Sequence, residues 1–292
     1  MSAKEEHMSK TIISILIWLV CMPCMAAEET SKELEAAKDK AKKEAIALFD
    51  TNETEAYTEK VHKLMDLCLK TNDEELYYKS WSNLAIFTFR HNAQKGLKVA
   101  DEMRDYAKEH DGKYGIVTAL YTQATRLFQT MAKQGMMPAE ICTRMNDALS
   151  GKDNENGMFV TLWLGLVDLP TGHLYYCNAG HNPPVIGGGD HHGDFLEMTA
   201  NAPIGLWPEL EYEGEEIDSI KNRLLFIYTD GLNEAENPQQ EQFGDDRLLD
   251  ALRRTNFVNA QQVIESMKQE VEAYRNGAEP NDDLTMMCVN VS

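Results

Sequence analysis

The chain has 292 residues, with 28 Lys and Arg against 48 Asp and Glu, which gives a formal net charge of −20. This length allows one large domain or two ordinary ones, each with a buried core. The acidic excess is greatest in residues 113–292, which carry 12 basic and 27 acidic residues. It argues against a nucleic-acid-binding surface, because phosphate binding needs basic clusters. Most of these acids are expected to form a solvated surface, although carboxylates can also collect a divalent cation.

The N-terminal segment predicts a secretory signal peptide over residues 1–27, with Met8 as a candidate natural start. Lys10 precedes an apolar run from Ile12 to about Met22, and the small residues of AA at 26–27 follow it, which is the layout of such a signal. The run is short for a membrane span, and an uncleaved signal anchor is the alternative. We therefore expect a periplasmic or membrane-anchored protein.

Residues 28–115 predict a helical region. The segment 31–49 is rich in Ala, Glu and Lys, which favours helix, and residues 55–70 place apolar side chains at helical spacing. Two further helices are expected over 73–91 and 93–111. Helix pairs with short polar turns and small residues at Ala85, Ala100 and Ala107 resemble a degenerate tetratricopeptide repeat. A plain helical hairpin domain is the alternative, and either structure would serve protein contact.

Beyond residue 111 the pattern predicts an α+β layered domain. Two helices are expected over 111–134 and 136–151, the second with Pro138 in its first turn. A strand over 158–168 is apolar on both faces, so we expect both faces to be covered. The remaining elements follow in chain order: a return strand at 173–180, a Gly-rich hairpin at 183–198, strands at 211–220 and 223–230, helices at 243–254 and 259–275, and a final strand at 284–291.

Four segments carry polar residues at expected strand or turn ends: NAGHNPP (178–184), NAPIGLW (201–207), YTDG (228–231) and NDDLT (281–285). The first contains three candidate site residues, Asn178, Gly180 and His181. Each of them has an ordinary structural role as an alternative, as a turn residue or a partner within the loop. The two histidines at 191–192 lie at the tip of the Gly-rich hairpin, where we expect a solvated loop.

Asp230 and Asp282 differ from the other acids because one closes an apolar strand and the other precedes one. If the two strands are antiparallel neighbours, both carboxylates reach the same sheet edge. Paired carboxylates repel one another, and a hard divalent cation relieves the repulsion. Such a cation lowers the pKa of a bound water enough to make a nucleophile near neutral pH. Gly231 would let the backbone approach that ion, and Thr229 precedes the acid.

These motifs, in the order AGHNPP, APIGL, YTDGLNEAE, FGDDRL and DDLT, are similar to those of PPM-type serine/threonine phosphatases, in the SpoIIE-like branch. The resemblance covers about 116–292. It implies a β-sandwich flanked by helices, with two Mg²⁺ or Mn²⁺ ions that activate water to hydrolyse phosphoserine or phosphothreonine, without a covalent nucleophile. Matched by motif, Asp230, Gly231 and Asp282, or Asp283 beside it, belong to the metal site, and Asn178, Gly180, His181 and Thr229 to an active-site loop.

The chain also departs from this family, because GGDFYD-like and DVSGHG-like segments, which supply the bridging aspartate, do not occur in it. We therefore expect an incomplete sandwich, a weak metal site and impaired hydrolysis. The helical region resembles the periplasmic part of some bacterial sensor kinases, and the join falls between about 113 and 125. The resemblance implies an anti-anti-sigma-like phosphoprotein substrate in the cytosol, which conflicts with export. The alternative is a non-catalytic interaction module, with protein partners on the helical region and a phosphatase remnant behind it.

Overall fold

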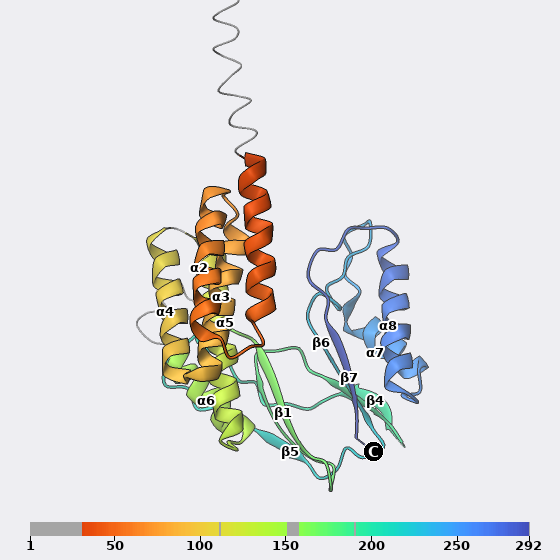
Figure 1. The fold of residues 1–292 in the computed structure, drawn as a ribbon. Coiled ribbons are helices and arrows are strands. Elements are labelled where there is room, and N and C mark those ends of the chain that lie inside the picture. Colours follow the sequence, from red (N-terminus) through yellow and green to blue (C-terminus); the bar gives the residue numbers. More distant parts are fainter. Residues whose placement is uncertain (1–30, 111, 151–157, 190, 292) are drawn as a thin grey trace, which may run out of the picture. The chain divides into compact units, whose positions relative to one another are not determined.

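The computed structural model describes residues 31–110, 112–150, 158–189 and 191–291. The chain divides into two compact units, one ending at Arg126 and the other beginning at Leu127 (Figure 1). The predicted signal peptide lies outside the described residues. Within the described ranges, no helix combines the length and the apolar character that a membrane span requires.

The helical unit, residues 31–126, is built from consecutive helices joined by short turns. A first helix covers residues 31–48. It is followed by α2 (Thr54–Lys70), α3 (Glu74–His91), α4 (Ala93–Glu109) and α5 (Lys113–Lys133), within which the boundary between the units falls. Side-chain caps explain where two of these helices begin. The Asp73 carboxylate accepts a hydrogen bond from the Leu76 amide at 3.1 Å, as the polar turn at 71–73 predicted.

Small and aromatic side chains form the core of the helical unit. Tyr57 of α2 stacks on Phe87 of α3, with ring centroids 4.0 Å apart. The three small residues that the sequence singled out, Ala85, Ala100 and Ala107, are fully buried. This packing supports a helical bundle. The finer resemblance to a tetratricopeptide repeat stays a prediction.

The C-terminal unit, residues 127–291, contains two antiparallel sheets. The first has the order β1-β2-β5 and the second β4-β3-β6-β7. Their strands are β1 (Leu162–Asp168), β2 (His173–Ala179), β3 (Val185–Gly188), β4 (His191–Phe195), β5 (Glu215–Ile217), β6 (Leu224–Tyr228) and β7 (Met286–Asn290). The helices of this unit are α6 (Pro138–Leu149), α7 (Gly244–Arg254) and α8 (Ala260–Arg275).

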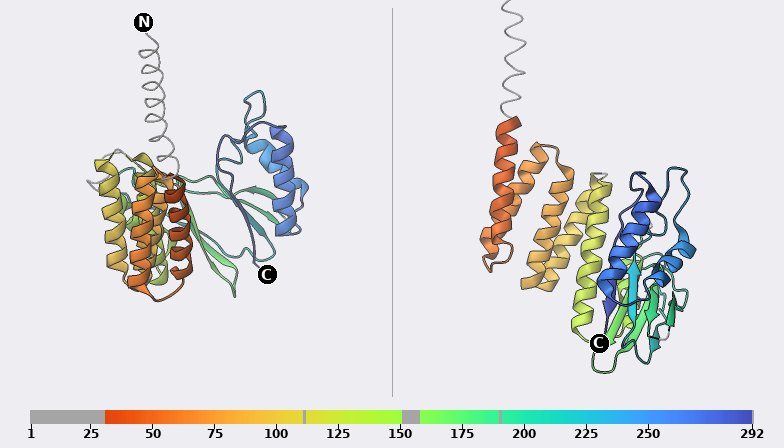
Figure 2. Two further views of the ribbon diagram at one scale, coloured as in Figure 1. Left: turned by 45° about the horizontal axis from the view of Figure 1, so that its top comes forward. Right: turned by 90° about the vertical axis from the view of Figure 1, so that its right-hand side faces the viewer.

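The alternation of side chains along β6 explains the layers of this unit. Leu224, Phe226 and Tyr228 belong to a core shared with α7 and α8, whereas Leu225 and Ile227 face the core between the sheets. Both faces of β6 are therefore covered, which accounts for its uninterrupted apolar sequence. Figure 2 shows α7 and α8, in blue, beside this sheet. On the other side α6 packs on β1 and β2, so the unit is an α+β sandwich flanked by helices.

The prediction that the strand at 158–168 is covered on both faces is wrong. Among the described strands, β1 pairs with β2 alone and forms the edge of its sheet. Trp163 packs into the core between the sheets, but Leu166 is 45 % exposed. Periodicity reports which side chains are apolar, and it cannot report whether a neighbouring element is present to cover them.

Candidate functional site

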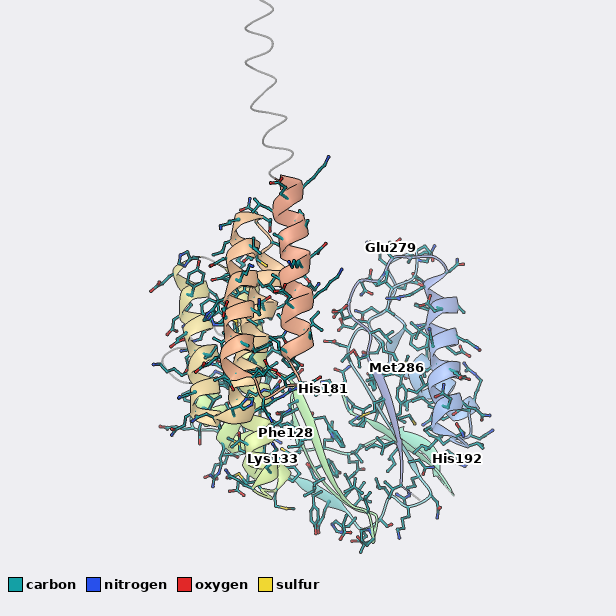
Figure 3. The ribbon with its side chains drawn as sticks, in the orientation of Figure 1. Phe128, Lys133, His181, His192, Glu279 and Met286 are labelled. Carbon is teal, nitrogen blue, oxygen red and sulfur yellow. The ribbon has the colours of Figure 1, made fainter. Side chains whose placement is uncertain are left out.

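The pairing of β6 with β7 brings the two acidic segments to one end of the sheet. The strands are antiparallel, and their register places Tyr228 opposite Met286 (Figure 3 labels Met286 at the start of β7). Asp230 follows the last residue of β6, and Asp282 and Asp283 precede the first residue of β7. The arrangement on which the sequence interpretation depended is therefore confirmed.

Thr229 ties the two acidic loops together through three hydrogen bonds. Its amide donates to the Thr285 carbonyl at 3.0 Å, and its hydroxyl donates to the Asp283 carbonyl at 3.1 Å. The same hydroxyl oxygen accepts a bond from the Thr285 amide at 2.9 Å. Thr229 thus continues the strand ladder for one step beyond β6 and holds the loops in a fixed relation.

Gly231 is required at this junction because the other acidic loop passes directly over it. A Cβ at this position would lie 2.5 Å from the Asp283 carbonyl oxygen and 2.9 Å from the Asp283 carbonyl carbon. The sequence interpretation assigned this glycine to the approach of an ion. The structure adds a second reason for a glycine here, the close backbone of the loop that carries Asp283, and the approach of an ion stays a prediction.

The three carboxylates are exposed, and two of them form hydrogen bonds within their own loops. Oδ1 of Asp230 accepts from the Gly231 amide at 3.1 Å, and Oδ1 of Asp282 accepts from the Asp283 amide at 2.7 Å. Asp230, Asp282 and Asp283 are all solvent-exposed. Exposure leaves them hydrated, so repulsion between them is weak. Their assignment as metal ligands stays a prediction.

The NAGHNPP segment lies at the same end of the sheet. The Asn178 side chain accepts a hydrogen bond from the His181 amide at 3.0 Å, and Gly180 takes a positive φ of 73° that favours glycine. Burial lowers the pKa of the His181 imidazole, while the negative charge of Asp230 partly opposes this shift. The role of Asn178, Gly180 and His181 as an active-site loop stays a prediction.

Amide side chains connect the loop that follows Asp230 to its neighbours. Asn182 donates to the Asn233 side chain at 3.0 Å, and Asn233 in turn donates to the Asp245 carboxylate at 3.0 Å. Asn281 donates to the Glu234 carbonyl at 2.9 Å. The AGHNPP, DGLNEA, FGDD and NDDLT motifs are thus joined by direct hydrogen bonds.

The NAPIGLW segment completes the cluster, and Asn146 of α6 holds it in place. Asn201 donates to the Asn178 carbonyl at 2.9 Å. Asn146, which is fully buried, donates to the Trp207 carbonyl and accepts from the Gly205 amide, each at 2.9 Å. Sequence reasoning missed Asn146. Its position on the otherwise apolar face of the helix over 136–151 was the available signal, because a buried amide needs partners.

The two histidines at 191–192 belong to the β4-β3-β6-β7 sheet and lie at the end opposite to Asp230. The register pairs Gly187 with Leu224, the first residue of β6, whereas Asp230 follows the last. Figure 3 shows His192 far from the start of β7. The His192 side chain is exposed, in agreement with the expected solvated hairpin tip.

The acidic residues at this edge do not fit a complete metal centre. Carboxylate oxygens are suitable ligands for Mg²⁺ or Mn²⁺. However, within the part of the chain that the structure describes, no three or more His, Cys, Asp or Glu side chains converge on a point that could hold a metal ion. If Asp230, Asp282 and Asp283 are metal ligands, as the sequence predicts, they are therefore an incomplete set.

Sequence comparisons place these motifs in a known family. The family model SpoIIE, described as stage II sporulation protein E, matches residues 117–292. The chain is 34 % identical over 147 residues to Protein IcfG of Synechocystis, which covers 49 % of this chain and 22 % of that protein. It is 28 % identical over 123 residues to the phosphoserine phosphatase RsbP of Bacillus subtilis, which covers 41 % of this chain and 30 % of RsbP. The chain thus aligns with less than a third of either relative.

Comparison with solved structures supports the fold of the C-terminal unit. The SiaA-PP2C domain of Pseudomonas aeruginosa superposes with a TM-score of 0.50 at 20 % identity, covering 61 % of this chain and 71 % of that domain. The family model extends over more than half of the chain and includes all four polar segments. The chain therefore belongs to the SpoIIE family, and its residues 117–292 are a PP2C-type phosphatase domain.

Proposed function

We propose that this domain hydrolyses phosphoserine or phosphothreonine in a regulatory phosphoprotein, with slow turnover. The observation that carries the proposal is the β6–β7 register, which joins the loop of Asp230 to the loop of Asp282 and Asp283. Membership in the SpoIIE family supports the reaction type. The exposure of the three acids supports slow turnover, because exposed carboxylates on two loops hold a cation weakly.

The cofactor that we propose is manganese or magnesium, on which members of this family depend. Asp230, with Asp282 or Asp283, would supply oxygen ligands to it. When bound, such an ion supplies a nucleophilic water near neutral pH. Because these acids are only part of a ligand set, we propose that occupancy requires metal at roughly millimolar concentration.

The substrate that we propose is a phosphoprotein of the anti-anti-sigma type. One relative is itself a phosphoserine phosphatase of Bacillus subtilis, which supports a phosphoserine substrate here.

Such a substrate would be cytosolic, whereas the apolar leader at residues 12–22 supports export. We propose that the leader directs the chain to the periplasm or membrane. Fractionation of cells that express the full chain tests this location, and recovery of the chain in the periplasm would contradict the cytosolic substrate.

The test of the proposed reaction is hydrolysis of a phosphoserine peptide with and without Mn²⁺. We expect slow release of phosphate that requires Mn²⁺ near 1 mM, a rough figure for a site with few ligands. Asp230→Asn is expected to abolish it, because the change removes a negative oxygen ligand and keeps the shape. Asp218→Asn, an exposed acid of the same unit, is the matched control and should keep the wild-type rate. Hydrolysis that is independent of Mn²⁺, or unaffected by Asp230→Asn, would contradict the proposal.

The second candidate function is a non-catalytic protein-interaction module. It is favoured by the helical unit, whose core of buried Tyr57, Phe87 and Met103 is formed from its own helices. In this case the helical unit binds protein partners, and the phosphatase domain is a remnant without catalytic activity. Complete absence of hydrolysis at saturating Mn²⁺ would select this function over the first.

A further inference from the structure

A pocket opens in the helical unit between the first helix (residues 31–48), α2 and α3. Its volume is about 250 Å³, and Figure 1 shows the three helices side by side. Most of its walls are apolar, and they include Ala45, Phe49, Val61 and Leu64. A space of this volume holds roughly eight water-sized groups, which suits a small ligand with an apolar body.

Tyr57 lines this pocket and carries a hydroxyl that can donate a hydrogen bond. The residue lines the pocket and is only 2 % exposed. Its ring is fixed by stacking on Phe87 and by an edge contact with Phe49 at 5.8 Å. Among the described residues, the hydroxyl makes no hydrogen bond. Burial raises the pKa of Tyr57, so the hydroxyl keeps its proton. The hydroxyl is not one of the described polar atoms that are closed off from water without a partner, so it stays accessible and can donate to a ligand oxygen.

Of the two charged residues that line the pocket in the described part of the chain, Asp50 and Lys42, only Lys42 is without an ion pair there. Asp50 lines the pocket, but its carboxylate is paired with Arg90 at 3.2 Å, and the Arg90 guanidinium lies 4.3 Å above the Phe49 ring. On the first helix, Glu44 is paired with Lys60 of α2 at 2.9 Å. Lys42 also lines the pocket, and it makes no ion pair with any residue that the structure describes. The charge that remains for a ligand is positive.

We propose that this pocket binds a small carboxylate with an apolar chain. The apolar chain would lie among Ala45, Phe49 and Leu64, where its burial stabilises the complex. The Tyr57 hydroxyl donates a hydrogen bond to a ligand oxygen, and the Lys42 ammonium balances the carboxylate charge. The helical unit is then a ligand-binding module. This inference does not depend on the phosphatase reaction, because every residue in it belongs to the helical unit.

The test is calorimetric titration of the full chain with octanoate, a carboxylate of about the right size. We expect saturable binding of one octanoate per chain. Lys42→Gln and Tyr57→Phe are each expected to weaken it about tenfold, the effect of one charge-assisted or buried hydrogen bond. Tyr57→Phe keeps the ring and its stacking, and Lys42 is exposed, so both variants should fold, which circular dichroism will verify.

The matched control is Lys40→Gln, which removes an exposed lysine of the same helix that does not line the pocket and should bind octanoate like the wild type. Octan-1-ol, which has the same chain length without the charge, should bind the wild type about tenfold more weakly than octanoate. Failure of octanoate to saturate the wild type would overturn the proposal. So would folded Lys42→Gln and Tyr57→Phe variants that bind it as tightly as the wild type does.

Discussion

Replacement of Asn146 by leucine is expected to lower the free energy of unfolding of the C-terminal unit by about 3 kcal/mol. The Asn146 side chain is fully buried and bonds the Trp207 carbonyl, the Gly205 amide and, at 3.4 Å, the Tyr212 hydroxyl. Leucine has a similar volume but can neither donate nor accept. The change therefore removes three hydrogen bonds without opening a large cavity.

Urea denaturation, followed by circular dichroism, measures this effect. The matched control is Asp147→Leu on the same helix. Asp147 is exposed, so its replacement should change the free energy of unfolding by less than about 0.5 kcal/mol. If Asn146→Leu were as stable as this control, α6 would not fix the NAPIGLW segment through Asn146.

The second large effect is expected for Gly231→Ala, which should destabilise the C-terminal unit by about 3 kcal/mol. The added methyl group would lie 2.5 Å from the Asp283 carbonyl oxygen, well inside van der Waals contact. Because the obstacle is backbone, a side-chain rotation cannot relieve the clash. The loop of Asp283 must move away from the loop of Asp230, at the cost of the hydrogen bonds that Thr229 makes.

Gly214→Ala provides a graded control for this substitution. Its Cβ would meet the Tyr176 carbonyl oxygen at 3.0 Å and the Ala139 methyl at 3.1 Å, so a shift of a few tenths of an ångström is sufficient. We expect a loss of about 1 kcal/mol, again measured by urea denaturation. Equal losses for the two alanine variants would show that the contact between the acidic loops is not tight.

The sequence predicted the elements that matter most for the candidate site, because local patterns determine them. The apolar run at Leu224–Tyr228 and the apolar C-terminal segment both became strands, and Pro138 begins α6 as expected. The meeting of Asp230 with the NDDLT segment depended on one condition, that the two strands are antiparallel neighbours. That condition is confirmed by the register of β6 and β7.

Other features could not be predicted, because they depend on contacts between residues far apart in the chain. The exposure of Leu166 on β1 depends on which strands are present beside it. The partner of Gly231 is a carbonyl more than fifty residues later. Asn146 bonds a segment about sixty residues away, and no local periodicity encodes such a choice. The helical pocket likewise requires three helices to be placed against one another.

Titration of Mn²⁺ into the full chain, with the free ion followed by electron paramagnetic resonance, tests most directly whether the acids at this sheet edge are part of a metal site. We predict weak binding, with a dissociation constant of roughly 1 mM, that is lost in Asp230→Asn and retained in Asp218→Asn. Binding at micromolar concentration would contradict the incomplete ligand set. Millimolar binding that persists unchanged in Asp230→Asn would contradict the assignment of the site to this edge.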